Sequence, residues 1–121
     1  MTRLMVMALL VTGAWLGGFA AAQGSKKAYM LVQVDVSNTS QYQEYAKLTP
    51  GIVAKYGGRY LARAGRTATL EGPAARSRVV VLEFPSFERA REFYDSPEYV
   101  AARKVREGAG TAQFVVVEGL E

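Results

Sequence analysis

The stretch that decides the fold is residues 78–100, RVVVLEFPSFERAREFYDSPEYV. Its first seven residues, Arg78–Phe84, are rich in β-branched and aliphatic side chains, a composition typical of a buried strand. Ser86 follows as the N-cap of a predicted helix, and Ser96 with Pro97 marks a second helix start soon after it. The stretch therefore predicts a buried strand followed by a helix in two parts.

The residues before this stretch predict a strand and a helix. Residues 28–36 (AYMLVQVDV) alternate between two faces, as a strand does. Asn38 is the predicted N-cap of the helix that follows, with Gln41 as its reciprocal partner in a capping box. Because proline lacks a backbone N–H, Pro50 predicts a kink or break of this helix near Thr49.

Three further strands complete the pattern. Residues 59–64 and 67–71 are short strand candidates joined through Gly65 and Arg66, and residues 111–118 (TAQFVVVE) form the last predicted strand. The order is then strand, helix, hairpin strand, strand, helix, strand. With both helices on one face of an antiparallel sheet, this order predicts an α+β, ferredoxin-like βαββαβ fold.

The N-terminal end has the pattern of a secretory signal peptide. Arg3 provides a positive start, residues 4–19 are apolar and uncharged, and three alanines at 20–22 suit an A-x-A cleavage site. Cleavage after Ala22 would leave residues 23–121 as a single domain, periplasmic or secreted and free of the membrane. The alternative is an uncleaved anchor, because the apolar stretch approaches the length that spans a bilayer.

The composition excludes several kinds of chemistry. The 121 residues include no Cys and no His, which rules out disulfides, thiolate nucleophiles, imidazole metal sites and Ser-His pairs. We therefore expect neither a metal nor a cofactor. The 15 Lys and Arg and 11 Asp and Glu give a net charge of +4. This mild excess is spread along the chain, which is typical of a soluble domain rather than of a nucleic-acid-binding one.

Alternation along the predicted strands separates two faces of the sheet. The first face is almost wholly apolar and is expected beneath the helices: Met30, Val32, Val34, Tyr60, Ala62, Val80, Leu82, Phe84, Phe114 and Val116. The second face is mixed: Tyr29, Leu31, Gln33, Asp35, Arg59, Leu61, Arg63, Val79, Val81, Glu83, Gln113, Val115 and Val117. Its apolar members would form an exposed patch, so we predict a homodimer through this face.

Charged and polar groups inside such a dimer must be paired or must meet a ligand. Arg59 and Arg63 lie at positions of one strand that project from the same face, where they would grip a carboxylate or an enolate. The alternative is that they pair across the dimer with Asp35 or Glu83, as salt bridges of the interface. Gln33 is a further candidate ligand contact on this face.

Tyrosines and carboxylates complete the set of candidates. Tyr60, Tyr94 and Tyr99 are candidate ligand contacts, with core packing as the alternative. Glu83 lies in an apolar strand, which would raise its pKa toward the range of a general base. In a chain without His, Glu83 and Asp35 are the best acid-base candidates. Neither belongs to an acidic cluster that would hold a metal.

Three motifs resemble those of a known family. They are residues 56–63 (YGGRYLAR), 82–86 (LEFPS) and 94–99 (YDSPEY). In this order they resemble the domain-of-unknown-function 1330 family, within the dimeric α/β-barrel superfamily, over about residues 28–120. The resemblance implies a ferredoxin-like fold and a homodimer whose two sheets form a barrel. It implies no function, because the family is named for lacking one.

The sequence thus predicts an exported homodimer that binds a small, partly apolar, oxygenated molecule. The superfamily also contains cofactor-independent monooxygenases and lactone-processing isomerases. An enzyme of that kind, with Glu83 or Asp35 as base and Arg59 or Arg63 holding an oxyanion, is the first alternative. A structural dimer without a ligand is the second.

Overall fold

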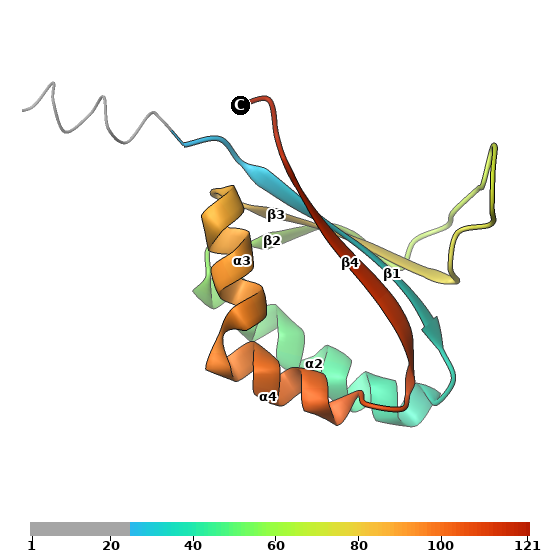
Figure 1. Ribbon diagram of the computed structural model, residues 1–121. Helices are drawn as coiled ribbons and strands as arrows, with labels where there is room; N and C mark the ends of the chain where they lie inside the picture. The colour runs from blue at the N-terminus through green and yellow to red at the C-terminus, as the bar shows by residue number, and fades with distance from the viewer. Residues whose placement is uncertain (1–24) are drawn as a thin grey trace, which may run out of the picture.

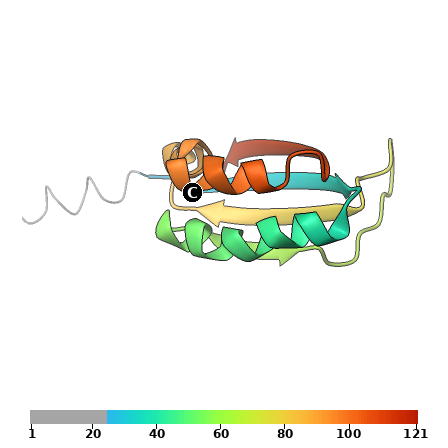
Figure 2. The ribbon, with the colours of Figure 1, turned by 90° about the horizontal axis from the view of Figure 1, so that it is seen from below.

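The computed structural model describes residues 25–121, and the predicted signal peptide lies outside the described residues. The elements along this part are β1 (Ala28–Val36), α2 (Thr39–Lys55), β2 (Arg59–Arg63), β3 (Arg78–Phe84), α3 (Phe87–Asp95), α4 (Pro97–Val105) and β4 (Gly110–Glu118). The strands form one antiparallel sheet in the order β2-β3-β1-β4. The helices cover one face of it (Figures 1 and 2). The predicted α+β, ferredoxin-like fold is confirmed.

The core lies between this sheet and the helices. β1 alternates as predicted, with Met30, Val32 and Val34 buried on the helix side. Phe84 and Phe93 stack with ring centroids 5.1 Å apart and join the sheet to α3. None of the helices in the described part of the chain is long and apolar enough to cross a membrane.

The three predicted N-caps are confirmed. The side chains of Asn38, Ser86 and Ser96 each accept a hydrogen bond from the backbone N–H three residues later, at 3.1, 3.0 and 3.1 Å. Each cap satisfies one of the free N–H groups at the start of its helix. The two parts of the second predicted helix are α3 and α4, which separate at Ser96.

The capping box predicted for Gln41 was wrong. Its side-chain amide instead donates to the carbonyls of Val105 and Glu107, at 3.0 and 2.7 Å, across the C-terminal end of α4. The N–H of Asn38, which the box would have used, already donates to the carbonyl of Ala109 at 3.1 Å. Gln41 therefore joins the start of α2 to the end of α4.

Of the kink or break predicted near Thr49, the break does not occur, because α2 continues through Pro50 to Lys55. Pro50 cannot donate to the carbonyl of Ala46, one turn earlier. That carbonyl instead accepts hydrogen bonds from Thr49 Oγ1 at 3.1 Å and from Arg63 Nη2 at 2.9 Å. Two side chains thus replace the missing backbone donor, and the helix continues.

β2 contains a register shift that changes the faces of its side chains. Its pairs with β3 are Arg59–Glu83, Tyr60–Leu82, Ala62–Val81 and Arg63–Val80. Leu61 is the extra residue of a β-bulge, so the alternation reverses after it. Ala62 therefore leaves the helix side of the sheet and Arg63 joins it. The prediction that Arg59 and Arg63 share a face was wrong.

Residues 64–77 form a long loop, which we call the arm, and the strand predicted at 67–71 does not form. β2, the expected hairpin partner of that strand, pairs with β3 instead. Figure 1 shows the arm projecting beyond the sheet, toward the side away from the helices. Leu70 in the arm is 93% exposed.

The face of the sheet away from the helices, which we call the open face, carries an exposed apolar row. At its centre Leu31 pairs with Val81 on one side and with Val115 on the other. Leu31, Val115 and Val117 are 43, 44 and 47% exposed. The predicted patch on the second face of the sheet is therefore present in the monomer.

Candidate functional site

A cleft of about 680 Å³ opens on the helix side of the sheet, between α3, α4 and β4. Its volume lies within the roughly 300–1,000 Å³ that is usual for small-molecule sites. The lining residues are Met30, Phe87, Arg91, Tyr94, Asp95, Arg103, Arg106, Ala112, Phe114 and Val116. They combine aromatic and aliphatic walls with charged groups.

The local sequence explains how these side chains meet. Alternation along β4 turns Ala112, Phe114 and Val116 toward the helices, where each is half-buried. The Ser96 cap separates α3 from α4. Tyr94, at the end of α3, packs against Phe114 with ring centroids 5.5 Å apart.

Arginines give the cleft its charge. The guanidinium carbon of Arg103 lies 4.5 Å from the centroid of the Tyr94 ring, which holds it over an aromatic face. In residues 25–121, Arg91, Arg103 and Arg106 form no ion pair with a carboxylate. The only acidic side chain that lines the cleft is Asp95. The cleft is therefore net positive.

Arg106 is held by aromatic rings where α4 ends. Its guanidinium carbon lies 5.1 Å from the centroid of Tyr45 and 5.3 Å from that of Phe114. Its Nε is buried without a hydrogen-bond partner. Burial lowers the pKa of Arg106, but Tyr99 and Tyr45 raise it by more, so the guanidinium remains charged.

A buried pair of phenols lies beside Arg106. The hydroxyl oxygens of Tyr45 and Tyr99 are 2.6 Å apart. Burial, followed by the neighbouring Tyr99, raises the pKa of Tyr45 far above its usual value. Burial also raises the pKa of Tyr99, although the Tyr45 hydrogen bond and Arg106 act in the opposite direction. Both phenols are therefore neutral at neutral pH.

The structure divides the predicted site residues among three places. Tyr94 lines the cleft, and Tyr99 is fully buried behind it. Tyr60 and Arg63 lie against α2, where the Tyr60 hydroxyl donates to Thr49 Oγ1 at 2.9 Å and the Arg63 guanidinium carbon lies 4.7 Å from the Tyr60 ring centroid. The cavity beside them has only about 30 Å³, too little for an organic ligand.

Arg59 and Glu83 are paired on the open face within one chain, whereas the alternative to ligand binding expected such pairs across the dimer. Arg59 donates to the two carboxylate oxygens of Glu83 from Nε and Nη2, at 3.3 and 3.2 Å, and Lys27 lies 3.3 Å from the same carboxylate. The Arg59 hydrogen bond holds the pKa of Glu83 below its usual value, against the effect of burial. The raised pKa predicted for Glu83 was wrong, because two cations surround the carboxylate.

Gln33 and Asp35 hold the end of the arm. Gln33 Oε1 accepts a hydrogen bond from the backbone N–H of Arg76, and Asp35 Oδ1 accepts one from that of Ser77, both at 3.0 Å. The guanidinium of Arg76 also lies 3.7 Å from the Asp35 carboxylate. These two polar groups of the open face are thus engaged within the chain.

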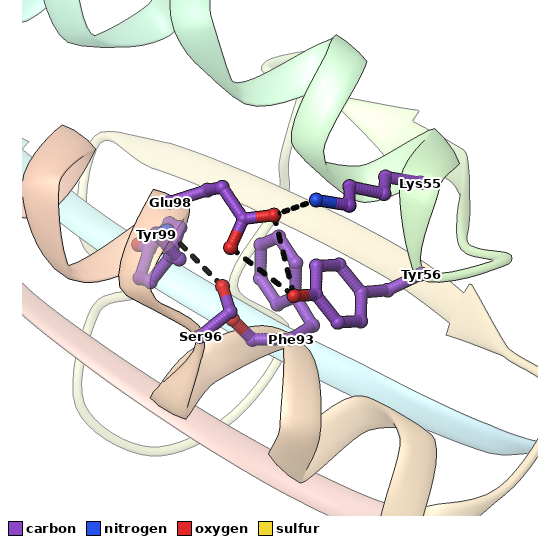
Figure 3. A network of polar contacts seen from close by, with 6 residues as sticks. All are labelled: Lys55, Tyr56, Phe93, Ser96, Glu98 and Tyr99. Atoms are coloured by element: carbon purple, nitrogen blue, oxygen red, sulfur yellow. Dashed lines mark hydrogen bonds and ion pairs between the residues drawn. The ribbon is translucent and has the colours of Figure 1, made fainter.

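A polar network joins α2 to the first turn of α4 (Figure 3). Glu98 accepts a hydrogen bond from the Tyr56 hydroxyl at 3.2 Å and pairs with Lys55. Ser96 donates to the carbonyl of Phe93 at 2.8 Å while it caps α4. The Ser96 hydroxyl is therefore engaged as both donor and acceptor, in agreement with its predicted role as a cap.

Sequence reasoning missed the arginines of the cleft. Tyr99, Arg103 and Arg106 recur at i, i+4 and i+7, which places them along one side of α4. Arg91, Tyr94 and Asp95 repeat at helical spacing on α3. This interleaving of arginine with tyrosine was the available signal. In the described part of the chain, no three His, Cys, Asp or Glu side chains are grouped to hold a metal.

Solved structures similar to this chain share its fold. A protein of unknown function from Rhodopseudomonas palustris is 20% identical with a TM-score of 0.65, over 89% of this chain and 93% of that one. SnoaB, described as a cofactor-independent oxygenase from Streptomyces nogalater, is 11% identical with a TM-score of 0.57, over 80 and 96%. A Bacteroides fragilis protein, described as dimeric with a ferredoxin-like fold, is 14% identical with a TM-score of 0.54, over 77 and 96%.

No curated protein matches the chain. The model of a family described as a domain of unknown function, DUF1330, matches residues 27–120. This match covers all the strands and helices from β1 to β4. The chain belongs to the DUF1330 family.

Proposed function

We propose that the protein is an exported homodimer that binds a small oxygenated organic molecule in the cleft between α3, α4 and β4. The observation that carries this proposal is the cleft itself, about 680 Å³ with aromatic and aliphatic walls and arginines at its margin. Such walls suit the hydrocarbon part of a ligand, and a few polar groups orient its oxygen atoms. Export is supported by the N-terminal pattern of the sequence.

The cleft is a better binding site than the open face. On the open face, Arg59 and Glu83 satisfy each other, and Gln33 and Asp35 hold the arm. In the cleft, three guanidinium groups lack a carboxylate partner from residues 25–121. A purely structural dimer would have no use for such a cluster, because unpaired like charges repel one another.

The open face supports the homodimer. Leu31 and its neighbours Val81 and Val115 form an apolar row across three strands, and a second copy would cover it. The arm projects toward the same side of the sheet (Figure 1), with Leu70 93% exposed. The Bacteroides fragilis protein of the same fold is described as dimeric.

A thermal-shift screen of the purified protein against oxygenated metabolites tests the binding function. We expect a ligand to raise the melting temperature of the wild type. Ala112→Leu, which partly fills the cleft, should abolish the effect, whereas Ala101→Leu on the exposed side of α4 should retain it. An equal response of Ala112→Leu, or no response to any compound, would contradict the proposal.

A second candidate is a cofactor-independent monooxygenase-like or isomerase-like enzyme. Arg103 and Arg106 in the lining of the cleft favour it, because guanidinium groups suit the binding of an enolate or another oxyanion. SnoaB, of the same fold, is described as a cofactor-independent oxygenase. Each compound that binds would be incubated with the protein in air, with oxygen uptake and products followed. Binding without oxygen uptake and without a product would exclude the enzyme hypothesis for that compound.

A further inference from the structure

We propose that the ligand of the cleft is an aromatic carboxylate whose anionic group is bound by Arg106. This inference rests on the proposed function and specifies the class of molecule. It assigns the ring system of the ligand to the walls formed by Phe87 and Phe114, and the carboxylate to the end of the cleft where α4 terminates.

The first argument is the charge of the lining. Arg91, Arg103 and Arg106 face one carboxylate, that of Asp95, and none of the three is in an ion pair within the described residues. A cleft lined mostly by one sign of charge concentrates ions of the opposite sign. An anion is therefore favoured over a neutral molecule of the same shape.

The second argument is the position of Arg106. The side chain is half-buried, and the rings of Tyr45 and Phe114 hold its guanidinium at 5.1 and 5.3 Å. A charged group removed from water is costly unless it is paired, and Arg106 has no carboxylate partner among residues 25–121. A ligand carboxylate in the cleft would supply one, since its two oxygens match the planar fork of a guanidinium.

The third argument is that no carboxylate of residues 25–121 pairs with Arg106 and competes with a ligand for its charge. The groups behind it are the hydroxyls of Tyr45 and Tyr99, which are neutral and lie 2.6 Å apart. Asp95, the one acidic group of the lining, lies on α3 rather than on α4. The charge of Arg106 is therefore available to an anion in the cleft.

The fourth argument concerns the body of the ligand. Phe87 and Tyr94 bring aromatic rings from the two ends of α3 and Phe114 brings one from β4, while Met30 and Val116 are apolar. Planar rings pack against such walls with little loss of conformational freedom. An aromatic acid combines an apolar ring with a single charged group. The cleft offers apolar walls for the ring and an arginine for the charged group.

The test compares matched compounds on the full-length protein by isothermal titration calorimetry. The probes are benzoate, cinnamate and naphthoate, their three amides, and naphthyl phosphate. We expect at least one acid to bind about tenfold more tightly than its amide, since a charge-assisted hydrogen bond contributes about that factor. Equal binding of acid and amide, tighter binding of the phosphate, or no binding by any of the acids would overturn the inference. A neutral compound that binds in the cleft would leave the proposed function intact.

Variants locate the anion. Arg106→Gln should weaken binding of the acid at least about tenfold and leave binding of the amide unchanged. Arg66→Gln also removes one positive charge, but on the exposed arm, so it should change the binding of neither the acid nor the amide. Arg106→Lys keeps the charge but not the planar fork, so it provides an independent check if Arg106→Gln unfolds, and it should also bind the acid more weakly. Wild-type affinity for the acid in both Arg106 variants would overturn the assignment.

Discussion

Arg63 donates a hydrogen bond from Nη2 to the carbonyl of Ala46 at 2.9 Å, where Pro50 leaves that carbonyl without its backbone donor. The contact joins the bulged edge strand β2 to the middle of α2. It explains how a helix with an internal proline remains continuous, and why this arginine is not available to bind a ligand on the open face.

A double-mutant cycle tests this relationship. Arg63→Met should reduce the free energy of unfolding by about 1 kcal/mol, the usual net value of a hydrogen bond. In the Pro50→Ala background the same change should cost less, because a backbone N–H at position 50 again bonds Ala46. The loss of the Arg63 contact with the Tyr60 ring is common to both backgrounds and cancels. Urea unfolding measures both values, and equal losses in the two backgrounds would disprove the coupling.

The homodimer proposed for the open face gives a second prediction. Leu31→Lys places a charge at the centre of the apolar row, so the protein should sediment as a monomer with an unchanged circular dichroism spectrum. Leu48→Lys is a matched control, because Leu48 is 46% exposed on α2 and Leu31 is 43% exposed on β1. The control should remain dimeric. A monomeric wild type at micromolar concentration would contradict the proposal.

The tyrosine pair predicts a loss of stability at alkaline pH. Burial raises the pKa of Tyr45 in the folded protein above the 10.0 of a free phenol, so above that pH the unfolded chain binds fewer protons than the native one. The free energy of unfolding should then fall as pH rises, by up to about 1.4 kcal/mol per pH unit for each such group. In Tyr45→Phe the fall should be shallower. Urea unfolding at a series of alkaline pH values checks this, and identical slopes would contradict it.

Because of the network in Figure 3, we expect the stability of the fold to decrease as pH falls in the acid range. The hydrogen bond from Lys55 holds the pKa of Glu98 below its usual 4.5, so this carboxylate stabilises the fold above that value. The stabilisation is lost as pH falls through the folded pKa. Glu98→Gln should therefore reduce the loss of melting temperature between neutral and acid pH. Glu88→Gln, an exposed residue in the first turn of α3, is the control and should behave as the wild type.

Much of the fold could be predicted because its signals are local. The caps at Asn38, Ser86 and Ser96 depend on contacts three residues away, and the alternation of β1 depends on the strand period alone. The strand predicted at 67–71 does not form: β2, its expected hairpin partner, pairs instead with β3, which lies further along the chain. Local pattern does not reveal which two strands will pair.

The candidate site was predictable only in part. Tyr94 was identified as a ligand contact from the sequence, and it lies in the cleft. Glu83 was expected to have a raised pKa from its apolar strand, but Arg59 and Lys27 lie beside it and lower the pKa. Cations on other segments of the chain thus keep that carboxylate in its ionised form.

Local sequence patterns specify the order of the elements, the caps and the apolar helix side of β1, and the composition excludes His and Cys chemistry. Which arginines are free for a ligand depends instead on long-range packing. The bulge at Leu61 turns Arg63 from the open face toward α2, because one extra residue reverses the alternation of a strand. Arg91, Arg106 and Phe114 line one cleft because α3, α4 and β4 pack around it, and the local periodicity of the sequence does not show this packing.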